Sequence, residues 1–398
     1  MDNKFDVIII GSGLGGLQCG YILSREGMKV CILEQHSQIG GCLQNFTRDN
    51  CVFDTGVHFI GGLDEGQVLN RYFKYFGLMD KLDLKRMDAN GFDTINFAGD
   101  PVEYKFAMGH EHFVDGLCHH FPSERKELEK YVGKLKDICN HFPLYSIREN
   151  EFQVSELQLF SENAFDYIRS VTHNRKLQNV LAGSNPLYAG IPEKTPLYVH
   201  ALVNNSFIES SWRVVKGSSH IATILAESII ENGGTILKKS KVEEFIFDNK
   251  KLTGVKLTNG ESFFATNIIS SIHPAKTIEM VDRTKIRSAY RERILNLENT
   301  TSNFIMYIVF KKDAFEYLNH NVYYYKNNNV WYSHDVRGKG WPNNYLLITP
   351  SSEQQQNFAD CATILTYMSM DEVRRWEHTT IEHRGDDYQA FKQQKAEQ

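Results

Sequence analysis

Residues 6–34 read DVIIIGSGLGGLQCGYILSREGMKVCILE, and this stretch decides the fold. The β-branched run at 6–10 is typical of a strand buried on both faces of a parallel sheet. It leads directly into a glycine turn, after which a helix is predicted to begin at Leu14. A second apolar run, 29–33, ends at Glu34. Strand, glycine turn, helix, strand and acid in this order predict a βαβ unit that binds a dinucleotide.

The glycine turn and the acid have predicted mechanical roles. Gly11 permits the tight turn, Gly13 lets the backbone approach a pyrophosphate, and Gly16 lets the helix pack close to the strand. The start of the helix favours phosphate because its first N–H groups lack partners. Glu34 would accept hydrogen bonds from ribose hydroxyls and repel a 2′-phosphate, so NADP is disfavoured. The predicted cofactor-binding residues of this unit are Gly11, Ser12, Gly13, Leu14, Gly15, Gly16, Glu34 and Gln35.

The next glycines favour FAD over NAD. In flavoproteins such as amine oxidases and phytoene desaturases, a glycine pair at the position of Gly40 and Gly41 lets the chain pass the ribityl-diphosphate region of FAD. Plain nicotinamide dehydrogenases do not need such a pair. A generic glycine turn is the alternative interpretation of these two residues.

More of the same domain is predicted far downstream. Three successive strands are expected at 241–247, 252–258 and 262–270, joined by hairpin turns and preceded by a helix over 218–231. This layout suits an FAD domain that is split by a substrate domain, with Val242 where the adenine ring contacts the backbone. A second glycine fingerprint is absent from the sequence, so no separate NAD(P)H domain is predicted.

The stretch 33–62, LEQHSQIGGCLQNFTRDNCVFDTGVHFIGG, resembles the retinol saturase family of flavoproteins, which is related to carotenoid isomerases and phytoene desaturases. Segments 322–325 and 384–392 are also similar to the family, so the resemblance reaches from end to end. The chain departs from the family at 44–46, where His-Thr-Phe is usual, and at 216–219, where a Gly-Gly pair is usual. These departures bear on substrate identity more than on flavin binding.

The resemblance implies an α/β fold, in which an FAD/NAD(P)-binding Rossmann-like domain is interleaved with an α+β substrate domain that contains a mixed sheet. The FAD-binding domain is expected at 1–91 and 212–274, and the substrate domain at 92–211 and 275–398. Related flavoproteins close the FAD site with a carboxyl-terminal strand–glycine–helix segment. We expect that segment to be absent here, either because the chain is a fragment or because it is a naturally short variant.

The resemblance also implies an FAD-dependent oxidoreductase acting on carbon–carbon double bonds of an apolar isoprenoid polyene, retinol-like or carotenoid-like. Saturation is the favoured direction, and an external electron donor or acceptor would be required. Four alternatives stay open on this scaffold: a polyene isomerase, a phytoene-type desaturase, an amine or porphyrinogen oxidase, and a truncated, inactive FAD-fold protein.

His58 is the candidate catalytic acid or base, because the loop at 54–56 is expected near the flavin and imidazole titrates in a suitable range. The alternative is a loop histidine that is hydrogen-bonded to backbone. Asp54 is better explained as a loop cap than as a base. Further candidates for the substrate pocket are Tyr188, His200 and Tyr325.

Composition excludes several classes of function. The net charge of −5, with dispersed Lys and Arg, argues against a nucleic-acid partner. The seven cysteines have no ligand spacing, which predicts reduced thiols in a cytosolic compartment and no metal site. No apolar run is long enough to span a membrane, although an apolar substrate would favour contact with a membrane surface. The helical repeat over 157–171 favours packing on a core over a lipid tunnel or membrane contact.

Overall fold

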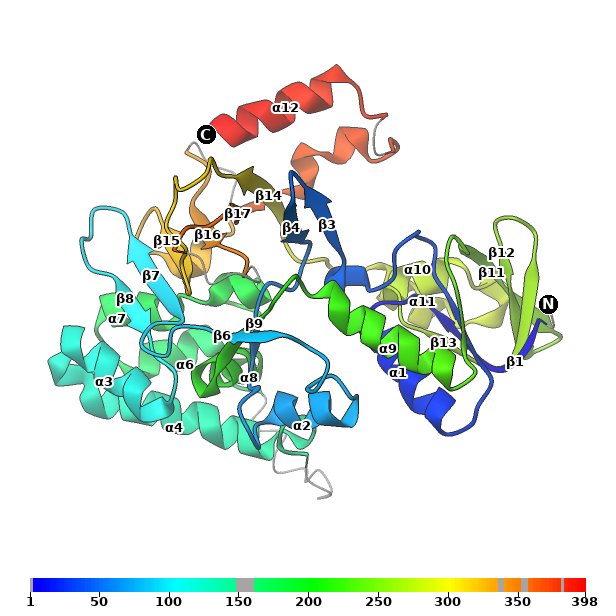
Figure 1. Ribbon diagram of the computed structural model, residues 1–398, viewed down its shortest axis with the longest axis horizontal. Helices are drawn as coiled ribbons and strands as arrows, with labels where there is room; N and C mark the ends of the chain where they lie inside the picture. The colour runs from blue at the N-terminus through cyan, green and yellow to red at the C-terminus, as the bar shows by residue number, and fades with distance from the viewer. Residues whose placement is uncertain (1–2, 148–160, 336–339, 352–356, 381–382) are drawn as a thin grey trace. The chain divides into compact units, whose positions relative to one another are not determined.

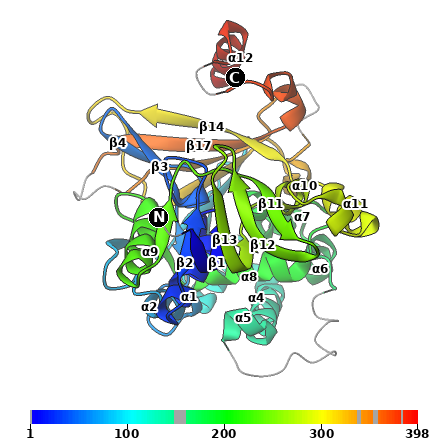
Figure 2. The ribbon, with the colours of Figure 1, turned by 90° about the vertical axis from the view of Figure 1, so that its right-hand side faces the viewer.

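The computed structural model describes residues 3–147, 161–335, 340–351, 357–380 and 383–398. The chain forms two compact units, whose elements are labelled in Figures 1 and 2. Unit 1 comprises Met1–His58, Tyr72–Asp83 and Val214–Asn299, and unit 2 comprises Phe59–Arg71, Leu84–Arg213 and Thr300–Gln398.

Unit 1 is built on a six-stranded sheet in the order β10-β2-β1-β13-β12-β11. β10, β2, β1 and β13 are parallel, and β13, β12 and β11 form an antiparallel meander. Both the early βαβ unit and the three downstream strands are therefore confirmed, and they share one sheet. The strands are β1 (Lys4–Ile10), β2 (Val30–Leu33), β10 (Thr235–Leu237), β11 (Val242–Asp248), β12 (Lys251–Leu257) and β13 (Ser262–Ser270).

Two helices, α1 (Leu14–Arg25) and α9 (Ser219–Glu231), lie side by side on one face of this sheet, as Figure 1 shows. A Cβ on Gly20 of α1 would lie 2.8 Å from Cδ1 of Ile32 in β2 and 3.0 Å from Cδ1 of Ile229 in α9. The missing side chain therefore lets α1 approach both neighbours. Unit 1 also contains η1 (Gly41–Leu43), β3 (Asn45–Arg48), β4 (Cys51–Asp54), α10 (Pro274–Glu279), η5 (Arg283–Lys285) and α11 (Ser288–Leu295).

Unit 2 is built on a mixed six-stranded sheet in the order β14-β17-β16-β15-β7-β8, in which β15 and β7 are parallel and the other pairs are antiparallel. The predicted mixed sheet is confirmed. Its strands are β7 (Asp93–Phe97), β8 (Tyr104–Phe106), β14 (Ser302–Val309), β15 (Asn321–Tyr325), β16 (Asn344–Ile348) and β17 (Cys361–Met368).

Helices pack with this sheet around the large hydrophobic core of unit 2, and Figure 1 shows α3 and α4 beneath β7 and β8. The helices of this core are α3 (His110–His120), α4 (Arg125–His141), α6 (Ala164–Val171), α7 (Arg175–Leu181) and α8 (Leu197–Glu209). The remaining elements of unit 2 are β5 (Ile60–Gly61), β6 (Leu84–Arg86), η2 (Pro122–Glu124), α5 (Pro143–Ser146), η4 (Asn185–Tyr188), η6 (Val330–Tyr332), η7 (Met370–Glu372), η8 (Arg374–Trp376) and α12 (Asp386–Glu397). Two elements, α2 (Val68–Tyr75) and β9 (Ser211–Val214), begin in unit 2 and end in unit 1.

The helical repeat predicted over 157–171 includes positions 157 and 160, which lie outside the described residues. Within them the helix is α6, and the Asn163 side chain caps it by accepting a hydrogen bond from the Asp166 N–H. Ala164, Ile168 and Val171 are buried in the core of unit 2, so the predicted core packing is confirmed for this part.

The segment at 275–299, expected in the substrate domain, belongs to unit 1. Met280 packs against the core formed by β1, β2 and the β11–β13 meander. The Arg291 guanidinium donates hydrogen bonds to the carbonyls of Ile278 and Val281, which ties α11 to α10. These contacts extend unit 1 to residue 299, and the sequence pattern does not reveal them.

Candidate functional site

The glycine turn after β1 is tightly closed. Gly11 has φ +94°, and its N–H donates to the Leu33 carbonyl at 2.9 Å. A Cβ on Gly16 would lie 2.1 Å from the Gly11 carbonyl oxygen, so a side chain at this position cannot be accommodated without a backbone shift. A Cβ on Gly13 or Gly15 would instead meet no atom within 4 Å, and Gly13 caps α1 without a side-chain hydrogen bond. The start of α1 therefore faces open space with N–H groups that no cap satisfies, which is the arrangement that binds a pyrophosphate.

Glu34 lies at the end of β2 beside this turn and is buried. Its Oε2 accepts hydrogen bonds from the Ser12 N–H at 3.0 Å and the Ser12 hydroxyl at 2.6 Å, and its Oε1 accepts one from the His36 N–H at 2.9 Å. Burial alone would raise the pKa of Glu34, but these hydrogen bonds outweigh burial and the pKa lies below its usual value. Glu34 is therefore an ionised acceptor, and a carboxylate keeps lone-pair sites for ribose hydroxyls.

The second glycine pair lies against the first turn. The Gly40 N–H donates to the Ser12 carbonyl at 2.9 Å, and Gly40 forms an isolated bridge with Gly13. A Cβ on Gly41 would lie 3.1 Å from the Gly13 Cα. Both Gly40 and Gly41 have positive φ, of 109° and 57°. The two glycine segments thus form one cradle of bare backbone, which a side chain would begin to fill.

Two other predicted residues flank this cradle. Gln35 follows Glu34, and its exposed side-chain amide lies 3.2 Å from Nε2 of His36. Val242 begins β11, and its side chain is buried in the core of the unit 1 sheet. The backbone just before it runs beside Glu34, because the Ser240 N–H donates to the Glu34 carbonyl at 2.7 Å. Any contact of Val242 with a cofactor would therefore involve its backbone.

Asp54 joins the loop after β4 to α9. Its Oδ1 accepts hydrogen bonds from the Ser218 N–H at 2.8 Å and the Ser218 hydroxyl at 2.9 Å, so this carboxylate binds a distant segment of unit 1 and not its own loop. Nothing in the sequence around Ser218 marks it as the partner of Asp54. The neighbouring Thr55 donates from its N–H and its hydroxyl to the Gln44 carbonyl, which packs the loop onto the segment after the glycine pair. His58 lies farther along this loop, half-buried at the last position of this part of unit 1.

Unit 2 contains a buried polar cluster around His200, which is fully buried. The Tyr131 hydroxyl lies 2.7 Å from its Nε2, and the Tyr188 hydroxyl lies 2.7 Å from its Nδ1. The Asn204 amide nitrogen lies 2.8 Å from the His200 carbonyl and 3.2 Å from Nδ1, so it donates to both. Nδ1 is then the acceptor, and Nε2–H donates to the Tyr131 hydroxyl. Tyr188 and His200 are thus brought together, whereas Tyr325 donates instead to the Gly183 carbonyl at 2.7 Å.

This cluster predicts an acid-sensitive fold, because burial lowers the pKa of His200 to about 3. Between about pH 6.5 and that value, His200 is protonated in the unfolded chain but stays neutral in the folded protein. The free energy of unfolding therefore falls by ~1.4 kcal/mol for each pH unit. His200→Gln, which keeps an amide donor and acceptor, is expected to lose less stability than the wild type between pH 7 and pH 5, by ~2 kcal/mol. Urea unfolding at the two pH values measures this difference.

His112→Gln provides the control, since His112 is an exposed histidine in the same unit. It should follow the wild-type pH dependence. Equal losses for the wild type and His200→Gln would contradict the assignment of this acid sensitivity to His200.

None of the groups of His, Cys, Asp and Glu side chains in the described part of the chain is arranged to hold a metal ion. No helix within the same ranges is both long enough and apolar enough to cross a bilayer.

Comparisons with known proteins agree with this geometry. A family model described as an NAD(P)-binding Rossmann-like domain matches residues 9–76. The chain is 28% identical over 280 residues to all-trans-retinol 13,14-reductase of Homo sapiens, a match that covers 65% of this chain and 45% of that protein. It is 25% identical over 286 residues to prolycopene isomerase 1, chloroplastic, of an Oncidium hybrid cultivar, covering 67% of this chain and 48% of that protein. The chain thus spans about half the length of these curated relatives.

Among solved structures, an oxidoreductase from Methanosarcina mazei superposes with a TM-score of 0.64 at 17% identity, covering 94% of this chain and 81% of that one. This likeness concerns the fold alone. The predicted α/β fold with a Rossmann-like domain is confirmed, and so is the resemblance to retinol saturase and its carotenoid-modifying relatives. The Rossmann-like match and the cradle together indicate a flavin or nucleotide cofactor.

Proposed function

We propose that this chain binds FAD and acts as an oxidoreductase on the carbon–carbon double bonds of an isoprenoid polyene, retinol-like or carotenoid-like, in the direction of saturation. The observation that carries the proposal is the cradle of Gly13, Gly40 and Gly41 beside the ionised carboxylate of Glu34. Similarity to a retinol reductase and a prolycopene isomerase supports the polyene substrate.

The cradle supports FAD over a nicotinamide dinucleotide. The glycine turn and α1 would hold the pyrophosphate, and Glu34 would bind the ribose hydroxyls. Gly40 and Gly41 extend the bare backbone past the turn, where the ribityl-diphosphate region of FAD would run. We propose a single such cofactor, since the Gly-x-Gly-x-x-Gly turn occurs once in the sequence, at residues 11–16.

The protein's part in the reaction is to orient the substrate, exclude water and move one proton. When bound, FAD supplies hydride exchange at N5, which adding hydrogen across a double bond requires. We propose His58 as the residue that holds or delivers the proton, because its loop packs on the segment that follows the glycine pair. The aromatic residues of the unit 2 core support the proposal that the substrate is apolar. An external donor would have to supply the electrons. We propose a cytosolic location with contact to a membrane surface.

Redox-neutral isomerisation of a polyene is the second candidate, favoured by the match to prolycopene isomerase. The FAD-loaded protein, reduced without oxygen and mixed with all-trans-retinol or a carotenoid, separates the two. Flavin reoxidation with loss of polyene absorbance supports the saturase, whereas an altered polyene spectrum over a flavin that stays reduced supports the isomerase. A polyene that reduces the oxidised flavin would indicate a desaturase. Turnover of amines with peroxide production, and no response to polyenes, would overturn the proposal.

Glu34→Ala is expected to weaken FAD binding by about tenfold or more, because a charged hydrogen-bond acceptor contributes ~1.5–3 kcal/mol. Titration of the purified protein with FAD, followed by flavin fluorescence, measures the dissociation constant. Glu243→Ala removes an exposed carboxylate of the same unit and should leave it unchanged. If Glu34→Ala retains FAD as well as Glu243→Ala does, the ribose assignment is wrong.

A further inference from the structure

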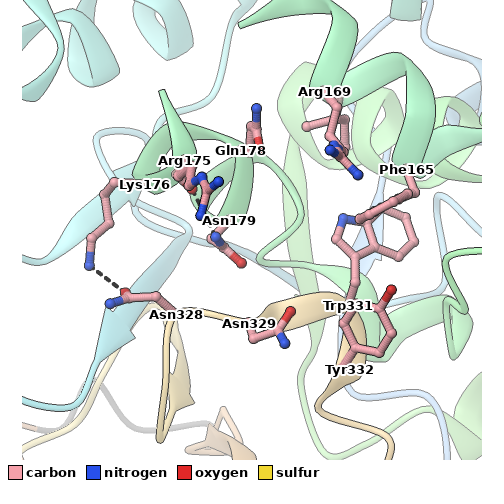
Figure 3. Close-up of a pocket in the computed structure, with 11 residues that line it drawn as sticks. Phe165, Arg169, Arg175, Lys176, Gln178, Asn179, Asn328, Asn329, Trp331 and Tyr332 are labelled. Atoms are coloured by element: carbon pink, nitrogen blue, oxygen red, sulfur yellow. Dashed lines mark hydrogen bonds between the residues drawn. The ribbon is translucent and has the colours of Figure 1, made fainter. Parts of the chain in front are cut away.

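Unit 2 has an open pocket of about 730 Å³ that the proposed reaction does not use. It is lined by one side of α6, by the first part of α7 and by the segment around η6, and Figure 3 shows these three walls. Its volume falls within the range of small-molecule sites. The pocket therefore has room for a ligand much larger than an inorganic ion.

The lining of this pocket is positively charged. Arg169, Arg175 and Lys176 line it, and none of the 11 lining residues is acidic. Lys176 is already neutralised, because its Nζ lies 2.8 Å from a carboxylate oxygen of Asp100. Neither Arg169 nor Arg175 forms an ion pair with any acid in the described parts of the chain. Two uncompensated guanidinium charges therefore face the same hollow, in a chain whose net charge is −5.

The walls that carry these charges are joined to each other. The Asn179 side chain accepts a hydrogen bond from the Val330 N–H at 3.0 Å and donates one to the Arg175 carbonyl at 2.8 Å. Lys176 donates to the Asn328 side chain, the bond drawn in Figure 3. These contacts hold the start of α7 against the segment around η6, so the pocket is formed before any ligand enters.

The pocket also has an aromatic side. Phe165 packs edge-on against Trp331 with ring centroids 5.7 Å apart, and the Arg169 guanidinium lies 5.0 Å from the Phe165 centroid. Tyr332 lies next to them and is 43% exposed, which leaves part of its ring available to a ligand. A flat or apolar body could thus pack beside the two arginines.

We propose that this pocket binds an organic phosphate monoester with a flat or apolar body. A phosphate monoester carries a charge of about −1.5 to −2 at neutral pH, which matches the two free guanidinium charges, whereas a carboxylate supplies half of that. Its oxygens are acceptors, and the two arginines present unused N–H donors within the described structure. Inorganic phosphate alone would leave the aromatic side uncovered. This inference concerns a site other than the cofactor cradle and does not rest on the proposed function.

Calorimetric titration of the full chain, saturated with FAD, with AMP as the probe tests the proposal. AMP should bind, whereas adenosine, which lacks the phosphate, should not. Arg169→Gln and Arg175→Gln should each weaken AMP binding by about tenfold, as expected for a lost charge-assisted hydrogen bond. Sedimentation with phosphatidylcholine vesicles containing phosphatidic acid tells whether a lipid headgroup can supply the same phosphate monoester.

Arg293→Gln is the matched control, because Arg293 is an exposed arginine that lies 5.3 Å from the Tyr290 centroid, outside the pocket. It should bind AMP like the wild type. Absence of AMP and vesicle binding would overturn the proposal. So would AMP binding that persists in Arg169→Gln and Arg175→Gln but is lost in Glu34→Ala, since the nucleotide would then occupy the cofactor cradle.

Discussion

Gly16→Ala is expected to abolish FAD binding and to destabilise unit 1. The new methyl group would lie 2.1 Å from the Gly11 carbonyl oxygen, which belongs to the backbone and cannot rotate away. The start of α1 would have to move away from the end of β1, opening the turn that is proposed to hold the pyrophosphate. Overpacking of this kind costs ~1–3 kcal/mol or more. FAD content after purification and the midpoint of thermal unfolding measure the two effects.

Gly133→Ala is the control for this substitution. Gly133 lies on the exposed side of α4 in unit 2, and a Cβ there would meet no atom within 4 Å. Alanine is favoured over glycine inside a helix by ~1 kcal/mol, so Gly133→Ala should stabilise the protein slightly and leave FAD content unchanged. Normal FAD content in Gly16→Ala would show that the glycine turn is not the cofactor site.

Arg213→Leu is expected to destabilise unit 2 by ~3–5 kcal/mol, the usual cost of removing one member of a buried charged network. Arg213 is 1% exposed. Its guanidinium donates to the Tyr317 hydroxyl, to the carbonyls of Leu318, His320 and Thr349, and to the Asn321 side chain. A leucine would remove all five hydrogen bonds, two of which, to the Thr349 carbonyl and the Asn321 side chain, are buried. Urea unfolding of the variant measures the loss.

Asp93 adds to the cost of losing Arg213. Burial raises the pKa of Asp93 to about 7, although the hydrogen bond from Asn321 and the charge of Arg213 both act to lower it. Without Arg213 the carboxylate form of Asp93 loses its nearby positive charge. Arg374→Leu, which removes an arginine whose side chain is 67% exposed, should change the free energy of unfolding by less than ~1 kcal/mol. Equal effects of the two substitutions would refute the structural role of Arg213.

The strands were predictable because they are runs of strand length, rich in apolar and β-branched residues, with clear turns between them. The run predicted at 6–10 is the end of β1, and those at 241–247, 252–258 and 262–270 correspond to β11, β12 and β13. The glycine cradle was also predictable, because two backbone segments can approach each other so closely only where the residues lack a Cβ. Gly16 and Gly41 carry that signal in the sequence itself.

Other features depend on contacts between distant segments and leave no local pattern. Arg213 stands in an ordinary strand sequence, and its acceptors come from residues around 317–321 and 349. His200 is one pocket candidate among several in the sequence, while its partner Tyr131 lies on another helix. The boundary after position 299 follows from how α10 and α11 pack on unit 1, which depends on the folded sheet.

The order of strands in unit 1 has a consequence for biosynthesis. β1 lies between β2 and β13 and pairs with β13, in a register that places Lys4 opposite Phe264. β1 therefore lacks one of its two neighbouring strands until β13 has been made. A ribosome makes the amino-terminal segments first, and the intervening chain, including much of unit 2, emerges before β13 exists. Closing so long a loop is slow, and until then β1 exposes an apolar edge. Nascent chains that stall before about residue 270 should therefore depend on chaperones and aggregate without them.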